Sequence, residues 1–227
     1  MESRKIKISS NEDPPLRLAV FASGSGTNFE AICDAIDARS LDAIVVLCVS
    51  DRDNAGVLQR ADARGIKTAV VNPADFPGEA DFSLKLLELL GDSQANFIAL
   101  AGYLRKVPAV VIEAFRNRIV NIHPALLPNF GGKGMFGFHV HRAVIACGAR
   151  VSGATVHIVD EAFDTGPIVA QCWVEVCEDE TPESLAERIL AVEHKLYPTA
   201  LQLFALGRVR VDESGVSIVQ PSERHPD

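Results

Sequence analysis

Short runs of apolar residues alternate with amphipathic segments through the first half of the chain. Apolar runs of strand length occur at residues 16–22, 43–50, 67–71, 96–101 and 119–122. Helical spacing of apolar positions occurs between them, at residues 28–38, 55–64 and 80–90. A continuous apolar strand is typical of a parallel sheet that is covered on both faces. The pattern therefore predicts a doubly wound α/β fold, with a mostly parallel sheet and helices on both faces.

The pattern changes in the last third of the chain. The later elements are two strands, the turn that joins them, a long helix and a small hairpin, at residues 151–160, 167–176, 163–166, 183–206, and 207–211 with 215–219. Strands joined by a turn add an antiparallel part to the sheet. We therefore expect an antiparallel addition toward the C-terminus.

The chain shows no internal repeat and no linker, which favours one domain. Residues 1–15 are interpreted as a disordered lead-in that closes at Pro14 and Pro15. Residues 16–211 are expected to form the single domain, and residues 212–227 a short hairpin strand and a loose tail.

The formal net charge of the 227 residues is −8. A nucleic acid or a membrane surface requires clustered Lys and Arg, so neither partner is expected. No stretch approaches the roughly 18 apolar residues that span a bilayer, and the N-terminus lacks the apolar core of a signal peptide. We therefore expect a cytoplasmic protein. An anionic substrate would require local cations, because salt screens the overall charge beyond about 8 Å.

No metal centre is expected from the cysteines or histidines. The five cysteines are dispersed and form no C-x-x-C pair. His139 and His141 could join His123 as three imidazole ligands, but no carboxylate stands at a supporting spacing. Residues 139–141 are interpreted instead as the solvated start of a helix.

The sequence SGSGTN follows the first predicted strand and opens a helix. Free backbone N–H groups at a helix N-terminus favour a phosphate, and Thr27 and Asn28 can add side-chain donors. A dinucleotide site is an alternative, in which Asp51 would accept a hydrogen bond from a ribose hydroxyl. That alternative is disfavoured because Phe29 stands where the dinucleotide fingerprint has its third glycine. A plain tight turn also stays open.

Polar residues end the predicted strand at 119–122. Asn121 and His123 are two positions apart, so their side chains point to the same side of an extended strand. An amide donor and a group that titrates near neutral pH are suited to stabilising an oxyanion and moving a proton. Asp164 in the turn FDTGP places a carboxylate between two later strands. A satisfied strand end and ordinary turn chemistry are the alternatives at these positions.

Four segments taken together resemble a known family. They are SGSGTN, LAGYLR at 100–105, NIHPALLP at 121–128, and GATVHIVDEAFDTGP at 153–167. In this order they resemble the phosphoribosylglycinamide formyltransferases over roughly residues 16–206. The resemblance implies an enzyme that transfers a formyl group from 10-formyltetrahydrofolate to the amine of phosphoribosylglycinamide in de novo purine biosynthesis.

The resemblance also implies a role for particular residues. The implied catalytic set is Asn121, His123 and Asp164. The implied acceptor site has Gly26, Thr27 and Asn28 at the phosphate and Glu193 at the ribose or amine. The implied folate site is formed by Leu104, Arg105, Lys106, Val107 and Asn121, with backbone near 159–163. Both substrates are small molecules, no metal is required, and a homodimer stays open.

Two basic residues could supply the local positive charge that an anionic substrate would require. Arg105 would meet the requirement for a local cation, and Lys133, in the glycine-rich stretch 131–138, is a further candidate.

Asp164 is expected to keep His123 protonated, because a neighbouring carboxylate raises the pKa of a histidine. The proton of the attacking amine would then pass through Asp164, directly or by water, to the departing folate nitrogen.

Three other functions remain as alternatives. Methionyl-tRNA formyltransferases share the later two segments but add a C-terminal domain, and a chain this acidic is not expected to bind tRNA. Formyltetrahydrofolate deformylases add an N-terminal domain, for which residues 1–15 leave little room. A non-catalytic folate- or nucleotide-binding module would not need all three catalytic residue types.

Overall fold

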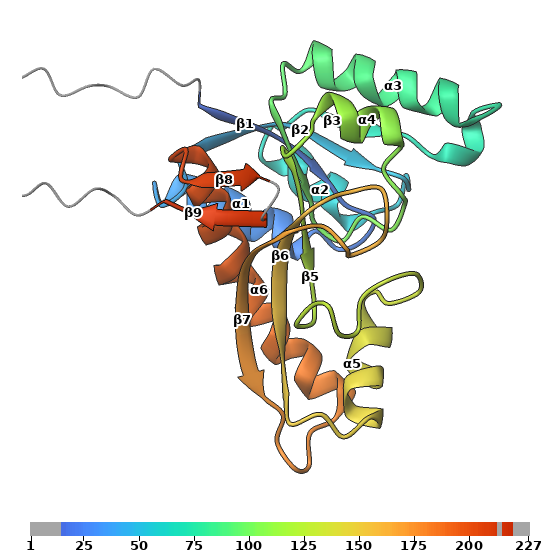
Figure 1. Ribbon diagram of the computed structural model, residues 1–227. Helices are drawn as coiled ribbons and strands as arrows, with labels where there is room; N and C mark the ends of the chain where they lie inside the picture. Colours follow the sequence, from blue (N-terminus) through green and yellow to red (C-terminus); the bar gives the residue numbers. More distant parts are fainter. Residues whose placement is uncertain (1–14, 213–214, 220–227) are drawn as a thin grey trace, which may run out of the picture.

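Five parallel strands make up one side of a seven-stranded sheet in the computed structural model, which describes residues 15–212 and 215–219 (Figure 1). The strands are β1 (Leu16–Phe21), β2 (Ala43–Ser50), β3 (Thr68–Val70), β4 (Phe97–Leu100) and β5 (Ile119–His123). Their spatial order is β3-β2-β1-β4-β5, so the winding direction reverses between β3 and β4. Every side chain of β4 and most of those of β1 are buried, as expected for strands covered on both faces. The predicted doubly wound fold is confirmed.

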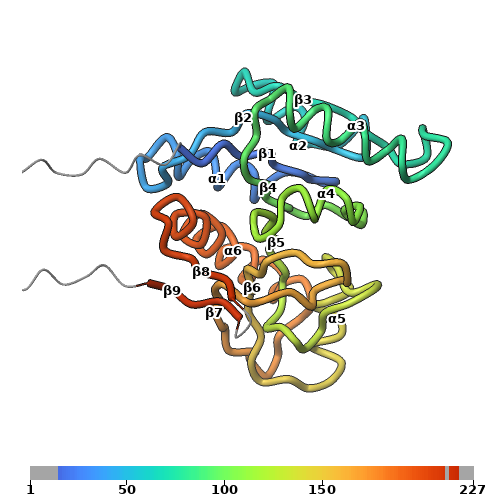
Figure 2. The backbone as a smooth tube through the Cα atoms, turned by 45° about the horizontal axis from the view of Figure 1, so that its top comes forward, coloured from blue at the N-terminus to red at the C-terminus, as the bar shows by residue number. Residues whose placement is uncertain are grey.

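Helices cover both faces of this sheet. One face packs against α1 (Thr27–Asp37), α2 (Gly56–Ala63), α5 (Phe138–Ala146) and α6 (Pro182–Ala205). The other packs against α3 (Glu79–Asp92) and α4 (Ala109–Ala114), and a 3-10 turn, η1 (Pro73–Asp75), precedes α3. Helices α1 and α6 contact each other although they are far apart in sequence (Figure 2). Segments from near both ends of the chain therefore pack together on this face of the sheet.

The sequence pattern does not predict two of these helices in full. Helix α4 has only six residues and follows Pro108, so it is too short for apolar spacing to repeat. Helix α5 begins at the end of the glycine-rich stretch, and only its start near residues 139–141 is anticipated. Both helices are set by packing rather than by local pattern.

The antiparallel part of the sheet follows, as predicted. Strand β6 (Val151–Ile158) pairs antiparallel with β5, and β7 (Ile168–Glu175) pairs antiparallel with β6 at the sheet edge. Strand β6 ends two residues earlier than expected, because the Asp160 carboxylate accepts hydrogen bonds from the Ala162 N–H and the Thr165 hydroxyl in a turn. Only glycine fits at Gly166, where a Cβ would lie 1.9 Å from the Ile158 carbonyl oxygen.

A small hairpin ends the described chain. Strands β8 (Val209–Asp212) and β9 (Gly215–Ile218) pair antiparallel, and their apolar side chains pack against the same core as α1 and α6. The predicted lead-in, apart from Pro15, and the predicted tail from residue 220 onward lie outside the described residues. Among the residues described, no helix combines the length and apolar character needed to cross a membrane.

Candidate active site

A cavity of about 530 Å³ opens at the carboxyl ends of β4 and β5. Three loops form its walls, at residues 102–107, 132–137 and 159–164. Ligands bind at this edge in open α/β sheets, because the chain separates there into loops on opposite faces. The segments at residues 102–107 and 121–123 therefore meet here, and the space between the loops is large enough for an organic substrate.

The structure brings Asn121, His123 and Asp164 together on the wall of this cavity. Asn121 and His123 lie on β5, and the loop between β6 and β7 places Asp164 beside them. The Asp164 carboxylate Oδ2 lies 3.6 Å from His123 Nδ1. Both side chains are largely buried, with exposed fractions of 4% for His123 and 11% for Asp164. An amide, an imidazole and a carboxylate thus lie together in one corner of the cavity, where the imidazole and the carboxylate are largely shielded from water.

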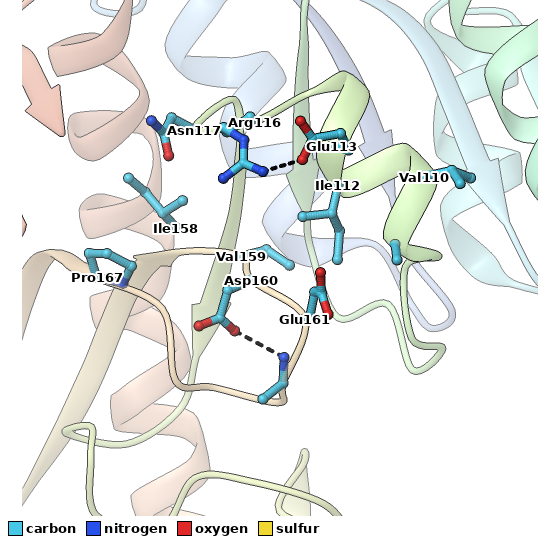
Figure 3. A pocket seen from close by; sticks show the side chains of 12 residues that line it. Val110, Ile112, Glu113, Arg116, Asn117, Ile158, Val159, Asp160, Glu161 and Pro167 are labelled. Atoms are coloured by element: carbon cyan, nitrogen blue, oxygen red, sulfur yellow. Dashed lines mark hydrogen bonds and ion pairs between the residues drawn. The ribbon is translucent and has the colours of Figure 1, made fainter. Parts of the chain in front are cut away.

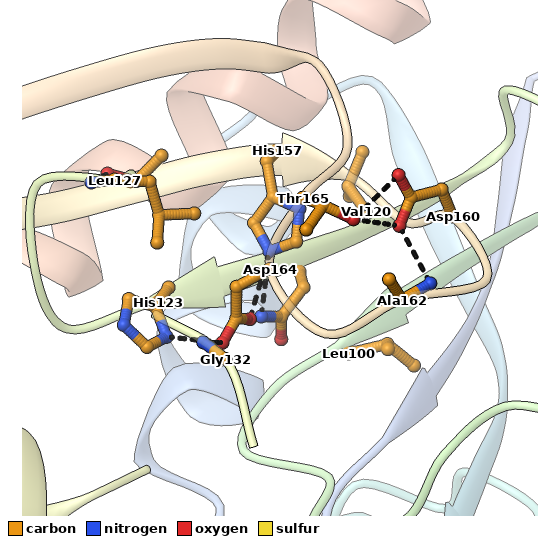
Figure 4. Close-up of polar contacts among 12 residues, drawn as sticks. Leu100, Val120, His123, Leu127, Gly132, His157, Asp160, Ala162, Asp164 and Thr165 are labelled. Carbon is orange, nitrogen blue, oxygen red and sulfur yellow. Dashed lines mark hydrogen bonds and ion pairs between the residues drawn. The ribbon is translucent and has the colours of Figure 1, made fainter. Parts of the chain in front are cut away.

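His157 is a fourth member of this group, and the sequence analysis missed it. It lies on β6 directly opposite Asn121, and its Nε2 is 3.1 Å from Asn121 Nδ2 and 3.5 Å from Asp164 Oδ1. Figure 4 shows Asp164 between the imidazoles of His123 and His157. The alternation of residues along β6 places His157 on this face, but the β5–β6 register was needed to find its partner.

The partners of the two imidazoles indicate their tautomers. A backbone carbonyl only accepts hydrogen bonds, so His157 Nδ1 donates to the Ile158 carbonyl at 3.0 Å. In the neutral ring, His157 Nε2 then accepts from the Asn121 amide, which keeps its second N–H for a ligand. His123 Nε2 donates to the Phe130 carbonyl at 2.8 Å, which leaves Nδ1 facing Asp164 without a proton in the neutral ring.

The expectation that Asp164 keeps His123 protonated is wrong for the free protein. Burial lowers the pKa of His123 by more than the Asp164 charge and the Phe130 carbonyl raise it. Burial raises the pKa of Asp164, but the Gly132 N–H that donates to its Oδ2, and the two imidazoles in their protonated forms, outweigh burial and lower that pKa. The free site therefore combines a neutral imidazole with a carboxylate that stabilises any proton the imidazole gains.

The glycine turn and α6 contact each other, and none of Gly26, Thr27, Asn28 and Glu193 is among the residues that line this cavity. Gly26 has φ of 79°, and a Cβ there would lie 2.7 Å from Val57, so only glycine fits. Thr27 begins α1, and the Asn28 side chain donates to Glu193 Oε2 at 2.7 Å. Burial raises the pKa of Glu193 to about 7. The structure thus joins the two segments that the resemblance assigns to one acceptor.

The segment 102–107 lines the cavity as expected, with one correction about charge. Leu104 and Lys106 are exposed and Val107 is buried. Arg105 was expected to supply a local cation for an anionic substrate, but its charge is paired, since its Nε donates to Asp51 Oδ2 at 2.7 Å. The Asp51 side chain is fully buried and occupied by this ion pair, so the dinucleotide alternative, in which Asp51 binds a ribose, does not fit.

A second hollow of about 620 Å³ lies beside the cavity, between α4 and residues 158–162 (Figure 3). Its charged side chains are Glu113, Arg116, Asp160 and Glu161, and Arg116 pairs with Glu113. The uncompensated charge is negative, which opposes an anionic ligand. The four polar groups described above converge on the first cavity instead, and none of them lines this hollow.

The described residues contain no group of three or more His, Cys, Asp or Glu side chains placed to hold a metal ion. His139 is exposed and contacts the Phe136 ring, whereas His141 is buried near His123. All five cysteines are free thiols, and Cys33 and Cys48 are buried. The imidazoles named in the sequence analysis therefore do not form one cluster.

Comparison with known proteins gives concordant matches. The formyl transferase family model matches residues 16–201. The chloroplastic phosphoribosylglycinamide formyltransferase of Arabidopsis thaliana is 42% identical, covering 98% of this chain and 76% of that protein. The phosphoribosylglycinamide formyltransferase of Bacillus subtilis (strain 168) is 40% identical, covering 82% of this chain and 93% of that protein.

A solved structure agrees with the family model and with the two relatives. Glycinamide ribonucleotide transformylase 1 from Symbiobacterium toebii superposes with a TM-score of 0.87 at 39% identity, over 93% of this chain and 100% of that chain. The resemblance identified from the sequence is confirmed. The match to the family model over most of the chain, supported by relatives at 40% identity or more, shows that this chain belongs to the formyl transferase family.

Proposed function

We propose that this protein transfers the formyl group of 10-formyltetrahydrofolate to the amine of 5′-phosphoribosylglycinamide. The products are formylglycinamide ribonucleotide and tetrahydrofolate, in de novo purine biosynthesis. The observation that most supports this reaction is the meeting of Asn121, His123 and Asp164 on one cavity wall. An amide donor, a proton acceptor and a carboxylate are the groups that formyl transfer between two nitrogens requires.

Asn121 stabilises the charge that develops when the amine attacks the formyl carbon. The carbonyl oxygen becomes an oxyanion, and the free N–H of the Asn121 amide donates to it. His157 supports this role, because its Nε2 fixes the orientation of the amide through the other N–H. One such donor is typically worth roughly 3–4 kcal/mol in the transition state.

His123 and Asp164 hold the proton that changes place during the reaction. The amine of the acceptor has a pKa of about 8, so part of it is neutral at pH 7. The neutral amine loses one proton as the new C–N bond forms. His123 Nδ1 accepts that proton, and the Asp164 carboxylate at 3.6 Å stabilises the imidazolium. The proton then passes to the N10 nitrogen of the folate as the old C–N bond breaks.

The two substrates bind on opposite sides of this corner. The phosphate of the acceptor binds at the N-terminus of α1, formed by Gly26, Thr27 and Asn28, and Glu193 contacts the ribose or amine end. The folate lies in the cavity against Leu104, Arg105, Lys106, Val107 and Asn121. No metal has a role in this scheme.

Asp164→Asn tests the reaction directly. We expect turnover to be abolished while the ribotide still binds with an affinity within about twofold of the wild type, since Asp164 acts on the proton rather than on binding. Turnover is followed as tetrahydrofolate release by absorbance, and ribotide binding by calorimetry. Near-normal turnover of the variant would contradict the assignment.

The same assay separates the alternatives. Tetrahydrofolate release that requires the ribotide supports the transferase, release without the ribotide supports a deformylase, and saturable folate binding without release supports a binding module. The cytoplasmic location, the absence of a nucleic-acid partner and the homodimer stay predictions. The name of the Arabidopsis thaliana relative places that protein in the chloroplast, so a test of location by cell fractionation has two compartments to distinguish.

A further inference from the structure

Asp51 is a buried carboxylate that the proposed reaction does not use. It follows β2 directly, and its side chain is 0% exposed. Its Oδ2 accepts from Arg105 Nε at 2.7 Å, while the nearest approach of Arg52 is 3.8 Å. Burying a carboxylate is costly unless an ion pair or a hydrogen bond compensates, so the contact with Arg105 is the one that keeps Asp51 in place.

The backbone next to Arg105 is held by other contacts. The Leu104 N–H donates to the Ser23 hydroxyl at 2.9 Å, and the Ser23 N–H donates to the Gly102 carbonyl at 3.0 Å. Ser23 follows β1 and is 2% exposed. The path of the segment 102–107 is therefore fixed without Asp51, and the ion pair fixes the side chain of Arg105.

Arg105 uses only one of its donor groups in this contact. Its Nε is bound to Asp51, and its terminal nitrogens have no partner among the residues that the structure describes. The Arg105 side chain is 47% exposed and lines the cavity in which the folate is proposed to bind. A guanidinium is planar, so anchoring Nε to an immobile carboxylate sets the direction of the two remaining NH2 groups.

We propose that Asp51 is a positioning residue for the folate donor: it holds Arg105 so that the terminal nitrogens meet an oxygen acceptor of the folate. This proposal rests on the proposed function of the cavity. The ion pair also neutralises most of the charge of Arg105. Arg105 therefore contributes a directed hydrogen-bond donor, not a long-range attraction.

The two possible roles of Arg105, as a directed hydrogen-bond donor or as a simple positive charge, predict opposite effects of Asp51→Asn on the KM for the folate. If Arg105 acted as a simple cation, removal of the neighbouring carboxylate would strengthen the binding of the anionic folate and lower its KM. If Asp51 sets the direction of Arg105, the KM for the folate rises. We expect a rise of about fivefold to tenfold, which corresponds to about 1–1.4 kcal/mol. The kcat and the KM for the ribotide should stay within about twofold.

A double-mutant cycle shows whether Asp51 acts through Arg105. Asp51→Asn, Arg105→Met and the double variant are compared by KM for 10-formyltetrahydrofolate, by kcat and by thermal midpoint. We expect Asp51→Asn to have no further effect in the background of Arg105→Met. Arg52→Met is the matched control, because Arg52 lies beside Asp51 but lines no part of the cavity, and it should leave the folate KM unchanged.

Arg105→Lys provides a second variant if Asp51→Asn does not fold. Lysine keeps the charge and can pair with Asp51 but has no fork of terminal nitrogens, so the KM for the folate should again rise about fivefold or more.

The possible results keep this proposal separate from the proposed function. Wild-type protein that shows no ribotide-dependent release would overturn the proposed function itself. An active wild type would overturn the positioning role if the KM of Asp51→Asn were unchanged or lowered. If Asp51→Asn raised the KM equally in the wild type and in the background of Arg105→Met, Asp51 would be a structural residue only. A wild-type KM for Arg105→Lys would lead to the same conclusion.

Discussion

Glu193 carries a carboxyl group whose protonation is coupled to folding. The side chain lies on α6 and is 7% exposed, and burial raises its pKa to about 7 from the reference value of 4.5. The folded state therefore favours the protonated carboxyl. The stability this gives is fully present below about pH 4.5 and is lost as the pH rises through 7. Above pH 7 the buried carboxylate therefore lowers the stability of the folded state.

Glu193→Gln should remove that pH dependence while keeping the contact with Asn28, because the Gln amide oxygen accepts as the carboxylate does. We expect equal unfolding free energies for the two proteins near pH 4.5, and a variant that is more stable by about 3 kcal/mol at pH 8, since one pKa unit corresponds to about 1.4 kcal/mol. Urea denaturation at both pH values measures the difference. A difference that is the same at both would contradict the assignment.

The residue scale also shows what the sequence predicts about the site. Asn121 and His123 are found from the alternation of a single strand, because both positions lie within one element. His157 and Asp51 act through partners on other elements, at separations of 36 and 54 residues. No local pattern specifies those pairings, so the contact of His157 with Asn121 and the ion pair of Asp51 with Arg105 become visible only in the structure.

At the scale of elements, α6 connects the glycine turn before α1 to strands β4 and β5. Tyr197 lies one turn after Glu193 and is fully buried. Its hydroxyl contacts the Leu100 carbonyl at 3.0 Å and the Val120 carbonyl at 3.1 Å, and these residues lie in or at the end of the neighbouring strands β4 and β5. One hydroxyl thus bridges two strands next to Asn121.

Tyr197→Phe should lower the unfolding free energy by about 1–2 kcal/mol, because the single hydroxyl proton that two buried carbonyl oxygens share is lost while the packing of the ring is kept. Tyr103→Phe is a matched control for stability, since the Tyr103 hydroxyl is buried and has no hydrogen-bond partner within the described residues. Chemical denaturation of both variants is the measurement. Equal effects of the two substitutions would show that the bridge adds nothing to stability.

Elements differ in how well the sequence predicts them. The parallel strands are predicted because burial on both faces leaves a continuous apolar run, and α6 because it has 24 residues. Helix α4 lacks a repeating pattern, since its six residues do not complete two turns. The position of β6 next to β5 is a matter of pairing between strands, which composition and periodicity do not specify.

At the scale of the whole molecule, a net charge of −8 opposes the approach of an anionic folate, and local cations must offset it. Arg105 is paired with Asp51, which leaves Lys106 and Lys133 on the cavity wall with no ion-pair partner among the described residues. Asp160 and Asp164 also line this cavity, but their carboxylates accept hydrogen bonds from Ala162, Thr165 and Gly132, whereas the two lysines are available to the folate. Salt at 0.15 M screens charges beyond about 8 Å, so carboxylates farther away have little effect. At physiological salt the overall charge therefore has little effect on the binding of the folate, and the unpaired lysines of the cavity wall attract it.

The KM for 10-formyltetrahydrofolate should therefore rise when NaCl is increased from about 0.05 to about 0.5 M, a range over which the screening length shortens severalfold. Each exposed ion pair is worth about 0.2–1 kcal/mol, so two lysines account for a rise of between about twofold and about thirtyfold. The double variant Lys106→Met and Lys133→Met should show a higher KM at low salt and little further change with salt. Steady-state kinetics across the salt range give both values. If the overall charge dominated instead, the KM of the wild type would fall as salt is added, because screening would then remove a net repulsion.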